Sequence, residues 1–238
     1  MFIMYKTEDF AFIFADFNPL DGFLGKTFSP PIAPFEAIQY TEKKRNGEGP
    51  SLSLPLASGV SYERYWVLRE QSDDRLEYID RAVYMTPSSS VRHQLISSRL
   101  HFQFSLFFRG KPCDVLAAPL DVELVDEQTG ERHVVVPDLT VICGEERLDG
   151  TKYIGVPPLI VEILSPSNQA HDLVTKFNLY MACGVHEYWI VNPMKQAVTV
   201  YVLNEERLYE QADVQVKTGT VRSVYFPGLA IDMAELFR

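Results

Sequence analysis

The stretch from Val136 to Asn168, VPDLTVICGEERLDGTKYIGVPPLIVEILSPSN, holds two acidic residues in segments that are otherwise apolar. Asp138 follows a proline, and Glu162 lies in the run Leu159–Leu164, where every other residue is apolar. Burying a single carboxylate is costly unless a cation or hydrogen-bond donors receive it. The same run predicts a central strand that is covered on both faces. These two acids are therefore the first candidates for a functional site.

The composition is that of a globular chain with an acidic surplus. The 238 residues are 46% hydrophobic and 23% charged, which permits a proper core. The formal net charge of −10 argues against a surface that binds phosphate everywhere. Residues 60–110 hold seven Arg and six acids, a net charge of +1, whereas residues 111–150 hold three basic and ten acidic residues, a net charge of −7. The acidic stretch is either a solvated face or a site that attracts a divalent cation.

Three features indicate a soluble cytoplasmic protein without membrane contact. No apolar run reaches the roughly 18 residues that a membrane-spanning helix needs. The first residues, MFIMYKTEDF, place two acids where a signal peptide would be apolar. The cysteines, Cys113, Cys143 and Cys183, show no CxxC pairing and no zinc-type spacing, and their odd number is typical of a reducing compartment.

The first 59 residues differ from the rest of the chain. They carry eight of the fifteen Phe and an extended, proline-rich stretch at residues 29–34. Because no periodic pattern lasts, residues 1–59 are predicted to be an aromatic arm and residues 60–238 to be the folded domain. Rings in such number must be buried, either on the same chain or on a second subunit.

From Ser61 onward the sequence predicts alternating helices and strands. Helices are predicted over residues 62–70, 91–108 and 172–183, the last ending at Gly184. Strands are predicted over residues 75–85 (two short strands turning at Asp80-Arg81), 115–125, 134–143, 159–164, 187–191 and 197–203. Short turns imply antiparallel pairing early in the chain, and the helix before residues 187–191 implies a parallel crossover. The predicted fold class is α/β, an α+β mixed sheet with additional β-hairpins.

Asp138 and Glu162 can meet if their strands are neighbours. On a strand over residues 134–143, Asp138 shares a face with Val136 and Thr140, and Glu162 shares one with Ile160. Two close carboxylates repel each other unless a cation lies between them. A hard, oxygen-coordinated ion such as Mg²⁺ (or Mn²⁺) suits this arrangement. The alternative for Glu162 is a structural carboxylate that is satisfied by an arginine or by backbone donors. The alternative for Asp138 is an acid at the strand edge that accepts hydrogen bonds from a turn.

Lys176 is the candidate for a cation that stabilises charge on phosphate oxygens. At about 100° per residue, Leu173, Phe177 and Tyr180 form the inward stripe of the predicted helix, and Lys176 lies about 60° to one side. Its side chain can extend along that stripe toward the sheet. The alternative is an Asp172–Lys176 pair, spaced i, i+4, on a wet surface.

Several short motifs together resemble a known family. The motifs are Pro137-Asp138, VEILSPS at residues 161–167, KFNLY at residues 176–180 and GVHEYW at residues 184–189. They resemble the Uma-two family of bacterial restriction endonucleases, which have a PD-(D/E)XK-nuclease-like fold. The likeness extends to Tyr62-Glu63, residues 76–80 and His93, so it covers the chain from about Ser61 onward.

The resemblance implies a restriction-endonuclease-like core of helix, three strands, helix and strand, and metal-dependent hydrolysis of DNA phosphodiesters. It assigns metal binding to Asp138 and Glu162. The position two after Glu162 is Leu164, where the general nuclease signature has lysine. The resemblance implies that Lys176, from the following helix, replaces that lysine.

Other candidates carry less specific signals. Glu77, His93 and Asp121 are possible accessory residues, although His93 could simply cap or pack a helix and Asp121 could lie on the surface. Ser165 and Ser167 could donate to a phosphate or cap the chain reversal. Contacts with DNA are expected from the least acidic stretch, through Arg64, Arg69, Arg92 and Arg99.

The sequence thus favours a Mg²⁺-dependent endodeoxyribonuclease, with a homodimer expected from the arm and from the symmetry of duplex DNA. The alternative is a non-catalytic nucleic-acid-binding or assembly module on a degenerate nuclease scaffold, which Leu164 and the acidic surface favour. A metal hydrolase acting on another phosphate ester is a third candidate.

Overall fold

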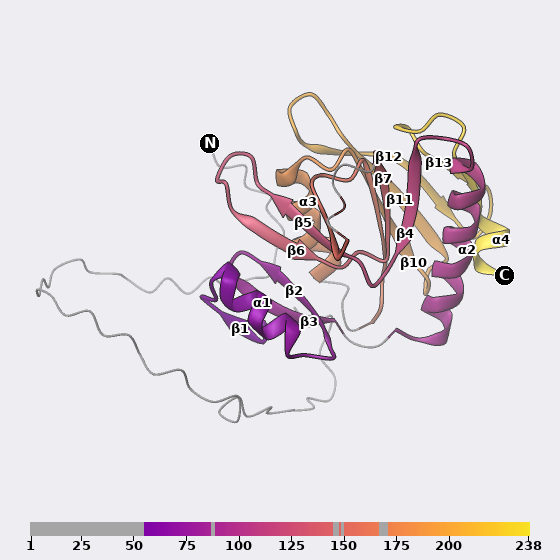
Figure 1. Cartoon of the computed structure of the whole chain (residues 1–238). Coiled ribbons are helices and arrows are strands. Elements are labelled where there is room, and N and C mark those ends of the chain that lie inside the picture. The colour runs from indigo at the N-terminus through magenta and orange to yellow at the C-terminus, as the bar shows by residue number, and fades with distance from the viewer. Residues whose placement is uncertain (1–54, 87–88, 145–147, 149, 167–170) are drawn as a thin grey trace, which may run out of the picture. The chain divides into compact units, whose positions relative to one another are not determined.

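The computed structural model describes residues 55–238 except 87–88, 145–147, 149 and 167–170 (Figure 1). The chain divides into two units, Met1–Asn46 and Gly47–Arg238, and every described residue belongs to the second. The expected arm over residues 1–59 therefore lies almost wholly outside the described residues. Within the described part of the chain, no helix is both long enough and apolar enough to cross a membrane.

Six strands form a first sheet in the order β1-β3-β2-β6-β5-β8. Their bounds are Ala57–Ser58 (β1), Ala82–Thr86 (β3), Arg75–Ile79 (β2), Arg132–Val135 (β6), Asp121–Val125 (β5) and Lys152–Ile154 (β8). The predicted turn between β2 and β3 is confirmed: Asp80 and Arg81 have φ of 49° and 59°, the left-handed values that a two-residue hairpin turn requires. Helix α1 (Tyr62–Glu70) forms where a helix is predicted and is capped by Ser61, and its Tyr65 ring stacks on Tyr78 of β2.

Six further strands form a second sheet in the order β12-β11-β10-β9-β7-β4. Their bounds are Tyr209–Val216 (β12), Ala197–Leu203 (β11), Glu187–Asn192 (β10), Leu159–Ile163 (β9), Leu139–Cys143 (β7) and Cys113–Ala117 (β4). The predicted crossover is confirmed, because β9 and β10 pair in parallel, whereas β7 and β9 pair antiparallel. A third, two-stranded sheet consists of β13 (Thr220–Arg222) and β14 (Ala230–Asp232).

Helices cover both faces of the second sheet around its central strand β9. Helix α2 (Val91–Phe108) and the short α4 (Met233–Phe237) pack against each other, and α2 packs on β4 and β9 (Figure 1). On that face Leu159, Val161 and Ile163 meet the buried stripe of α2, which runs through Ile96, Leu100 and Phe104. On the opposite face Ile160 and Leu164 join the core beneath α3 (Phe177–Cys183). The prediction of a strand covered on both sides is confirmed.

The helix predicted over residues 172–183 begins as a π-helix, His171–Lys176, and continues as α3 to Gly184. Gly184 has φ of 84°, and its backbone N–H caps the helix by donating to carbonyls of the last turn. A side chain at this position would be strained, which explains why glycine ends the helix there.

Two predicted strands are wrong, and both are broken at a proline. The segment 115–125 divides into β4 and β5 around Pro119, and the segment 134–143 divides into β6 and β7 around Pro137. In each case the two halves belong to different sheets. Proline has no N–H for the strand ladder, so the chain leaves one sheet and enters the other there. Asp138 therefore lies in a connection between sheets, not within a strand.

Two of the three cysteines form a pair that the sequence did not indicate. Cys113 and Cys143 occupy directly opposed positions of β4 and β7, and their sulfurs form a disulfide. Cys183 is the remaining thiol and is buried. The sequence interval of 30 residues between Cys113 and Cys143 gave no sign of this pairing, because the register of two strands brings them together. The cysteines consequently give no support for a reducing compartment.

Candidate active site

The sequence-predicted acids line one small cavity of about 30 Å³, which has room for one or two water-sized groups. Its lining residues are Thr86, Ser89, His93, Val136, Asp138, Glu162, Ile163, Ser165, Asp172 and Lys176. Strand pairing explains why the two acids meet. Leu139 of β7 is the register partner of Val161 of β9, so Asp138, one residue earlier, falls opposite Glu162. The cavity thus forms where the chain enters the second sheet.

Asp138 is fixed by two donors on the same carboxylate oxygen. Its Oδ2 accepts from the backbone N–H of Ile163 at 2.8 Å and lies 3.0 Å from Nε2 of His93. Because Asp138 is an acceptor, His93 carries its proton on Nε2 in this pair. Burial lowers the pKa of His93, but the hydrogen bond to Asp138 and the nearby negative charges outweigh burial and raise that pKa above its usual value. Among the described residues none donates to Oδ1 of Asp138.

Glu162 is buried on the face of β9 that meets α3. Its Oε1 accepts from Nζ of Lys176 at 2.9 Å and from the hydroxyl of Tyr180 at 2.7 Å. Burial raises the pKa of Glu162 to about 7, an effect that Lys176 opposes and that the charge of Asp138 reinforces. No described residue donates to its other oxygen, Oε2. Each of the two acids therefore keeps one oxygen without a donor in the described part of the chain.

Lys176 lies at the centre of a buried group of carboxylates. Its Nζ is 2.8 Å from Oε1 of Glu77, 2.9 Å from Oε1 of Glu162 and 3.6 Å from Oδ1 of Asp172. Burial would lower the pKa of Lys176, but these acids raise it well above its ordinary value, so the amine stays an ammonium. The Asp172–Lys176 pair considered for a wet surface exists, but both side chains are buried. The inward placement of Lys176 is thus the correct alternative.

Glu77 enters the group from β2 of the first sheet. Its Oε1 also accepts from the backbone N–H of Val136 at 2.8 Å, and its Oε2 is 3.2 Å from Nε2 of His171. Burial raises the pKa of Glu77, but the charge of Lys176 and the contact with His171 outweigh it and lower that pKa to about 2. Glu77 is therefore a permanent negative charge at neutral pH.

Sequence reasoning did not select three of the buried polar residues around this cavity. They are His171, Asp172 and Tyr180, all at most a few per cent exposed. The signal was present, because Asp172, Lys176 and Tyr180 follow at intervals of four residues and so share one face of the helix. For His171 no comparable spacing exists.

The other predicted accessory residues divide between the cavity and other places. Ser165 lines the cavity, and Ser167 lies outside the described residues. Asp121 does not line the cavity and instead accepts from Arg69 at 3.4 Å. Burial raises the pKa of Asp121, which the charge of Arg69 opposes.

The arginines predicted to contact DNA have different surroundings. Arg92 is exposed in the first turn of α2, next to His93. Arg99 is half-buried and donates to the carbonyls of Leu236 and Arg238 at 3.1 and 2.6 Å, so it holds the C-terminus against α2. Arg99 thus has a structural role, and a contact between Arg99 and DNA stays a prediction.

A second group of possible metal ligands lies elsewhere. Ligand atoms of Asp80, Glu131 and His133 all lie within 4.8 Å of one another. Asp80 and Glu131 are exposed, and Nδ1 of His133 already accepts from the backbone N–H of Asp80 at 3.3 Å. Exposed acids gather without an ion in many proteins, so we favour the buried pair Asp138 and Glu162.

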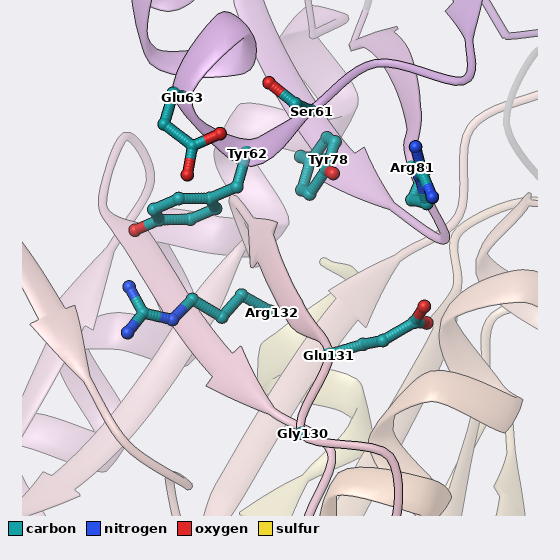
Figure 2. Close-up of a pocket in the computed structure, with 8 residues that line it drawn as sticks. All are labelled: Ser61, Tyr62, Glu63, Tyr78, Arg81, Gly130, Glu131 and Arg132. Carbon is teal, nitrogen blue, oxygen red and sulfur yellow. The ribbon is translucent and has the colours of Figure 1, made fainter. Parts of the chain in front are cut away.

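Near that second group lies a larger hollow of about 450 Å³ (Figure 2). It is lined by Ser61, Tyr62, Glu63, Tyr78, Arg81, Gly130, Glu131 and Arg132. Figure 2 shows the guanidinium of Arg132 under the ring of Tyr62, with 5.1 Å between the guanidinium carbon and the ring centroid. The Tyr62 hydroxyl donates to Glu123 at 2.6 Å. These groups satisfy one another, and we assign no reaction to this hollow.

A mixed α+β core with Asp138, Glu162 and Lys176 at one cavity agrees with the restriction-endonuclease-like fold that the sequence resemblance implies. Residues 61–234 match the Uma2 family, described as "Putative restriction endonuclease". The chain belongs to this family, and the resemblance to it seen in the sequence is confirmed.

Two similar proteins are informative. The chain is 30% identical over 148 residues to "Uncharacterized protein slr1290" of Synechocystis sp. (strain ATCC 27184 / PCC 6803 / Kazusa), a match that covers 62% of this chain and 76% of that protein. A crystal structure of a "putative nuclease belonging to DUF820" from Anabaena variabilis ATCC 29413 superposes with a TM-score of 0.59 at 19% identity, covering 75% of this chain and 97% of that one. The structural likeness confirms the expected fold class.

Proposed function

We propose that this protein is a metal-dependent endodeoxyribonuclease that hydrolyses DNA phosphodiester bonds at the Asp138–Glu162 cavity. Hydrolysis adds water across one phosphorus–oxygen bond and leaves a phosphate monoester and a hydroxyl. The observation that supports the proposal best is the convergence of Asp138, Glu162 and Lys176, from three separate parts of the chain, on one cavity. Family membership supports the same reaction class.

The charges around the cavity fit a divalent cation such as Mg²⁺ or Mn²⁺. Four carboxylates, those of Glu77, Asp138, Glu162 and Asp172, surround Lys176 and His93. If all four acids are ionised and both basic groups are protonated, the group carries a net charge of −2. Burial raises the pKa of Glu162 to about 7 and the pKa of Asp172 well above its ordinary value, so a bound divalent ion would favour the ionised forms of these two acids. Asp138 and Glu162 would hold the ion, each through the oxygen that accepts no hydrogen bond from a described residue. When bound, it supplies Lewis acidity toward a phosphoryl oxygen and the attacking water.

The chain's own groups have separate parts in the reaction. The Lys176 ammonium would stabilise negative charge that develops on the phosphate oxygens. His93 and the Ile163 N–H orient Asp138, and Tyr180 orients Glu162. Ser165 at the cavity and Arg92 beside it are the proposed contacts with the DNA backbone, with Ser167 and Arg99 as further candidates. Leu164 lies in the apolar core, so the role that lysine has in the general nuclease signature would fall to Lys176.

The decisive test is metal-dependent DNA cleavage by the purified wild-type chain and its Asp138→Ala variant. We expect the cleavage rate of Asp138→Ala to fall by more than the roughly 10- to 100-fold that is typical when a residue that only orients a metal ligand is removed. Glu123→Gln is the control, because Glu123 is a more deeply buried acid (side chain 4% exposed, against 15% for Asp138) that pairs with Lys152 at 2.6 Å, away from the cavity. Equal cleavage by Asp138→Ala and wild type would show that the site is misplaced.

Calorimetry separates this proposal from a non-catalytic binding or assembly module. A nuclease of this design binds Mg²⁺ or Mn²⁺, and Glu162→Gln weakens that binding. Absence of binding to the wild-type chain, or binding that Glu162→Gln leaves unchanged, would favour the non-catalytic module. With DNA as the substrate, we keep the cytoplasm as the expected location. We also keep the homodimer as a proposal, which light scattering on the full chain tests.

A further inference from the structure

The ammonium of Lys176 is held from both sheets at once. Glu162 belongs to β9 of the second sheet, and Glu77 belongs to β2 of the first. The two contacts, at 2.9 and 2.8 Å, occupy two of the three N–H bonds of the ammonium. Oδ1 of Asp172, four residues before Lys176, lies 3.6 Å from the same nitrogen. Lys176 also lines the cavity, and neither glutamate takes its third N–H.

Glu77 is itself held rigidly. The backbone N–H of Val136, two residues before Asp138, donates to Oε1 of Glu77. His171 approaches Oε2 with Nε2, and its ring packs on Tyr84 with 4.5 Å between ring centroids. The Nδ1 atom of His171 is buried and has no partner among the described residues. Because a carboxylate only accepts, the hydrogen bond to Glu77 requires a proton on Nε2 of His171.

A buried group of charges of this kind is an inefficient way to stabilise the fold. A buried ion pair is often no more stabilising than well-packed apolar residues of the same volume, because both charges lose their hydration. Glu77, Lys176 and His171 are each at most 3% exposed. Their burial beside a cavity lined by Asp138 and Glu162 is better explained by the need to keep one ammonium in one place.

We propose that Glu77 is a positioning residue for Lys176, that His171 fixes Glu77, and that this pair sets the reach of the ammonium toward the phosphate. The proposal rests on the nuclease function proposed above. In the reaction Glu77 touches neither substrate nor metal. Its carboxylate contacts the ammonium independently of Glu162, so the ammonium keeps its place when Glu162 engages a metal ion.

The first experiment reads the position of Lys176 directly, without DNA. The ¹⁵N resonance of its side-chain ammonium is recorded in wild type and assigned from its loss in Lys176→Arg. Glu77→Gln keeps the side-chain shape but removes the charge, so we expect this resonance to shift or to broaden beyond detection. In Glu123→Gln, which changes the Glu123–Lys152 pair away from the cavity, it should stay unchanged. An unchanged resonance in folded Glu77→Gln overturns the proposal, whether or not the wild type cuts DNA.

The second experiment uses cleavage kinetics and metal binding. Glu77→Gln should lower kcat by roughly 10- to 100-fold and leave KM for DNA and the Kd for Mn²⁺ within about twofold of wild type. His171→Ala should lower kcat in the same direction by less. A fall in Mn²⁺ affinity as large as that of Glu162→Gln would make Glu77 a metal ligand instead and overturn the positioning role. If the wild type binds no metal and cuts no DNA, the proposed function fails, and the ammonium resonance still decides the positioning.

Discussion

At the scale of single residues, the candidate site depends on how each carboxylate is oriented by its donors. Asp138 is held through Oδ2 by the Ile163 N–H and by His93. Removing one donor leaves the other, so the acid should remain near the cavity but lose its fixed direction. His93 is therefore a sensitive place to test whether the orientation of Asp138 matters for metal binding.

His93→Ala is expected to weaken Mn²⁺ binding by roughly 10- to 100-fold, the usual cost of losing a group that orients a metal ligand. Isothermal titration calorimetry measures the change. His101→Ala is the control on the same helix, because Nε2 of His101 lies 3.1 Å from the carbonyl of Val115 and not at the cavity. Equal Mn²⁺ affinities for the two variants would contradict the role assigned to His93.

Glu77 should make stability depend on pH in a defined window. Lys176 and His171 lower its folded-state pKa from 4.5 to about 2, so between these values the unfolded chain binds a proton that the folded chain does not. The contribution of the Glu77 charge is complete above pH 4.5 and is lost as pH falls toward 2. In urea unfolding, the stability difference between wild type and Glu77→Gln should shrink by about 1.4 kcal/mol per pH unit below 4.5. A difference that is constant from pH 6 to 3 would contradict this.

At the scale of elements, the sequence predicted helices and individual strands better than their assignment to sheets. Residues 134–143 are rich in Val and other apolar residues on both sides of Pro137, so they read as one strand although the chain changes sheets there. The local pattern of apolar residues indicates which residues are buried. It does not indicate which sheet buries them, because both sheets have buried faces. Asp138 and Glu162 could be identified as candidate site residues from the sequence because acids in apolar segments are rare. The contact between Glu77 and Lys176 could not be predicted from the sequence, because it joins residues of separate elements.

Glu187 shows that a family motif can carry structure instead of chemistry. This fully buried acid of β10 accepts from the Trp189 indole, the Ser223 hydroxyl and the backbone N–H groups of Val224 and Tyr225. Burial raises its pKa, and the hydrogen bonds oppose that rise. It ties the segment after β13 to the second sheet, away from the cavity lining.

Glu187→Ala should therefore destabilise the fold by about 3 kcal/mol, because several buried donors lose their acceptor at once. Glu187→Gln should cost less, since one amide oxygen can still accept from Ser223 and its neighbours while the amide nitrogen faces the Trp189 N–H. Urea unfolding gives both values. Glu210→Gln, at an exposed position of β12, is the control and should change stability by less than about 0.5 kcal/mol. Metal affinity of folded Glu187→Gln should equal that of wild type.

At the scale of the whole molecule, the cavity lies where the two sheets meet. Glu77 comes from the first sheet, Glu162 comes from the second, and Asp138 lies in the connection from β6 to β7. Lys176 bridges the two sheets by its contacts with Glu77 and Glu162. An ion that neutralises the surplus negative charge there should therefore stabilise the domain and not only a loop.

Mn²⁺ at 100 times its Kd should add about 2.7 kcal/mol to the unfolding free energy, since the unfolded chain has no such site. For a domain of this size the gain corresponds to a rise in Tm of roughly 5 to 10 °C. Differential scanning calorimetry should show the rise in wild type and in Glu123→Gln, and its loss in Asp138→Ala and Glu162→Gln. Asp80→Asn tests the exposed group of Asp80, Glu131 and His133. If the rise survives Glu162→Gln but disappears in Asp80→Asn, the ion binds at the exposed group, and the buried pair does not form the metal site.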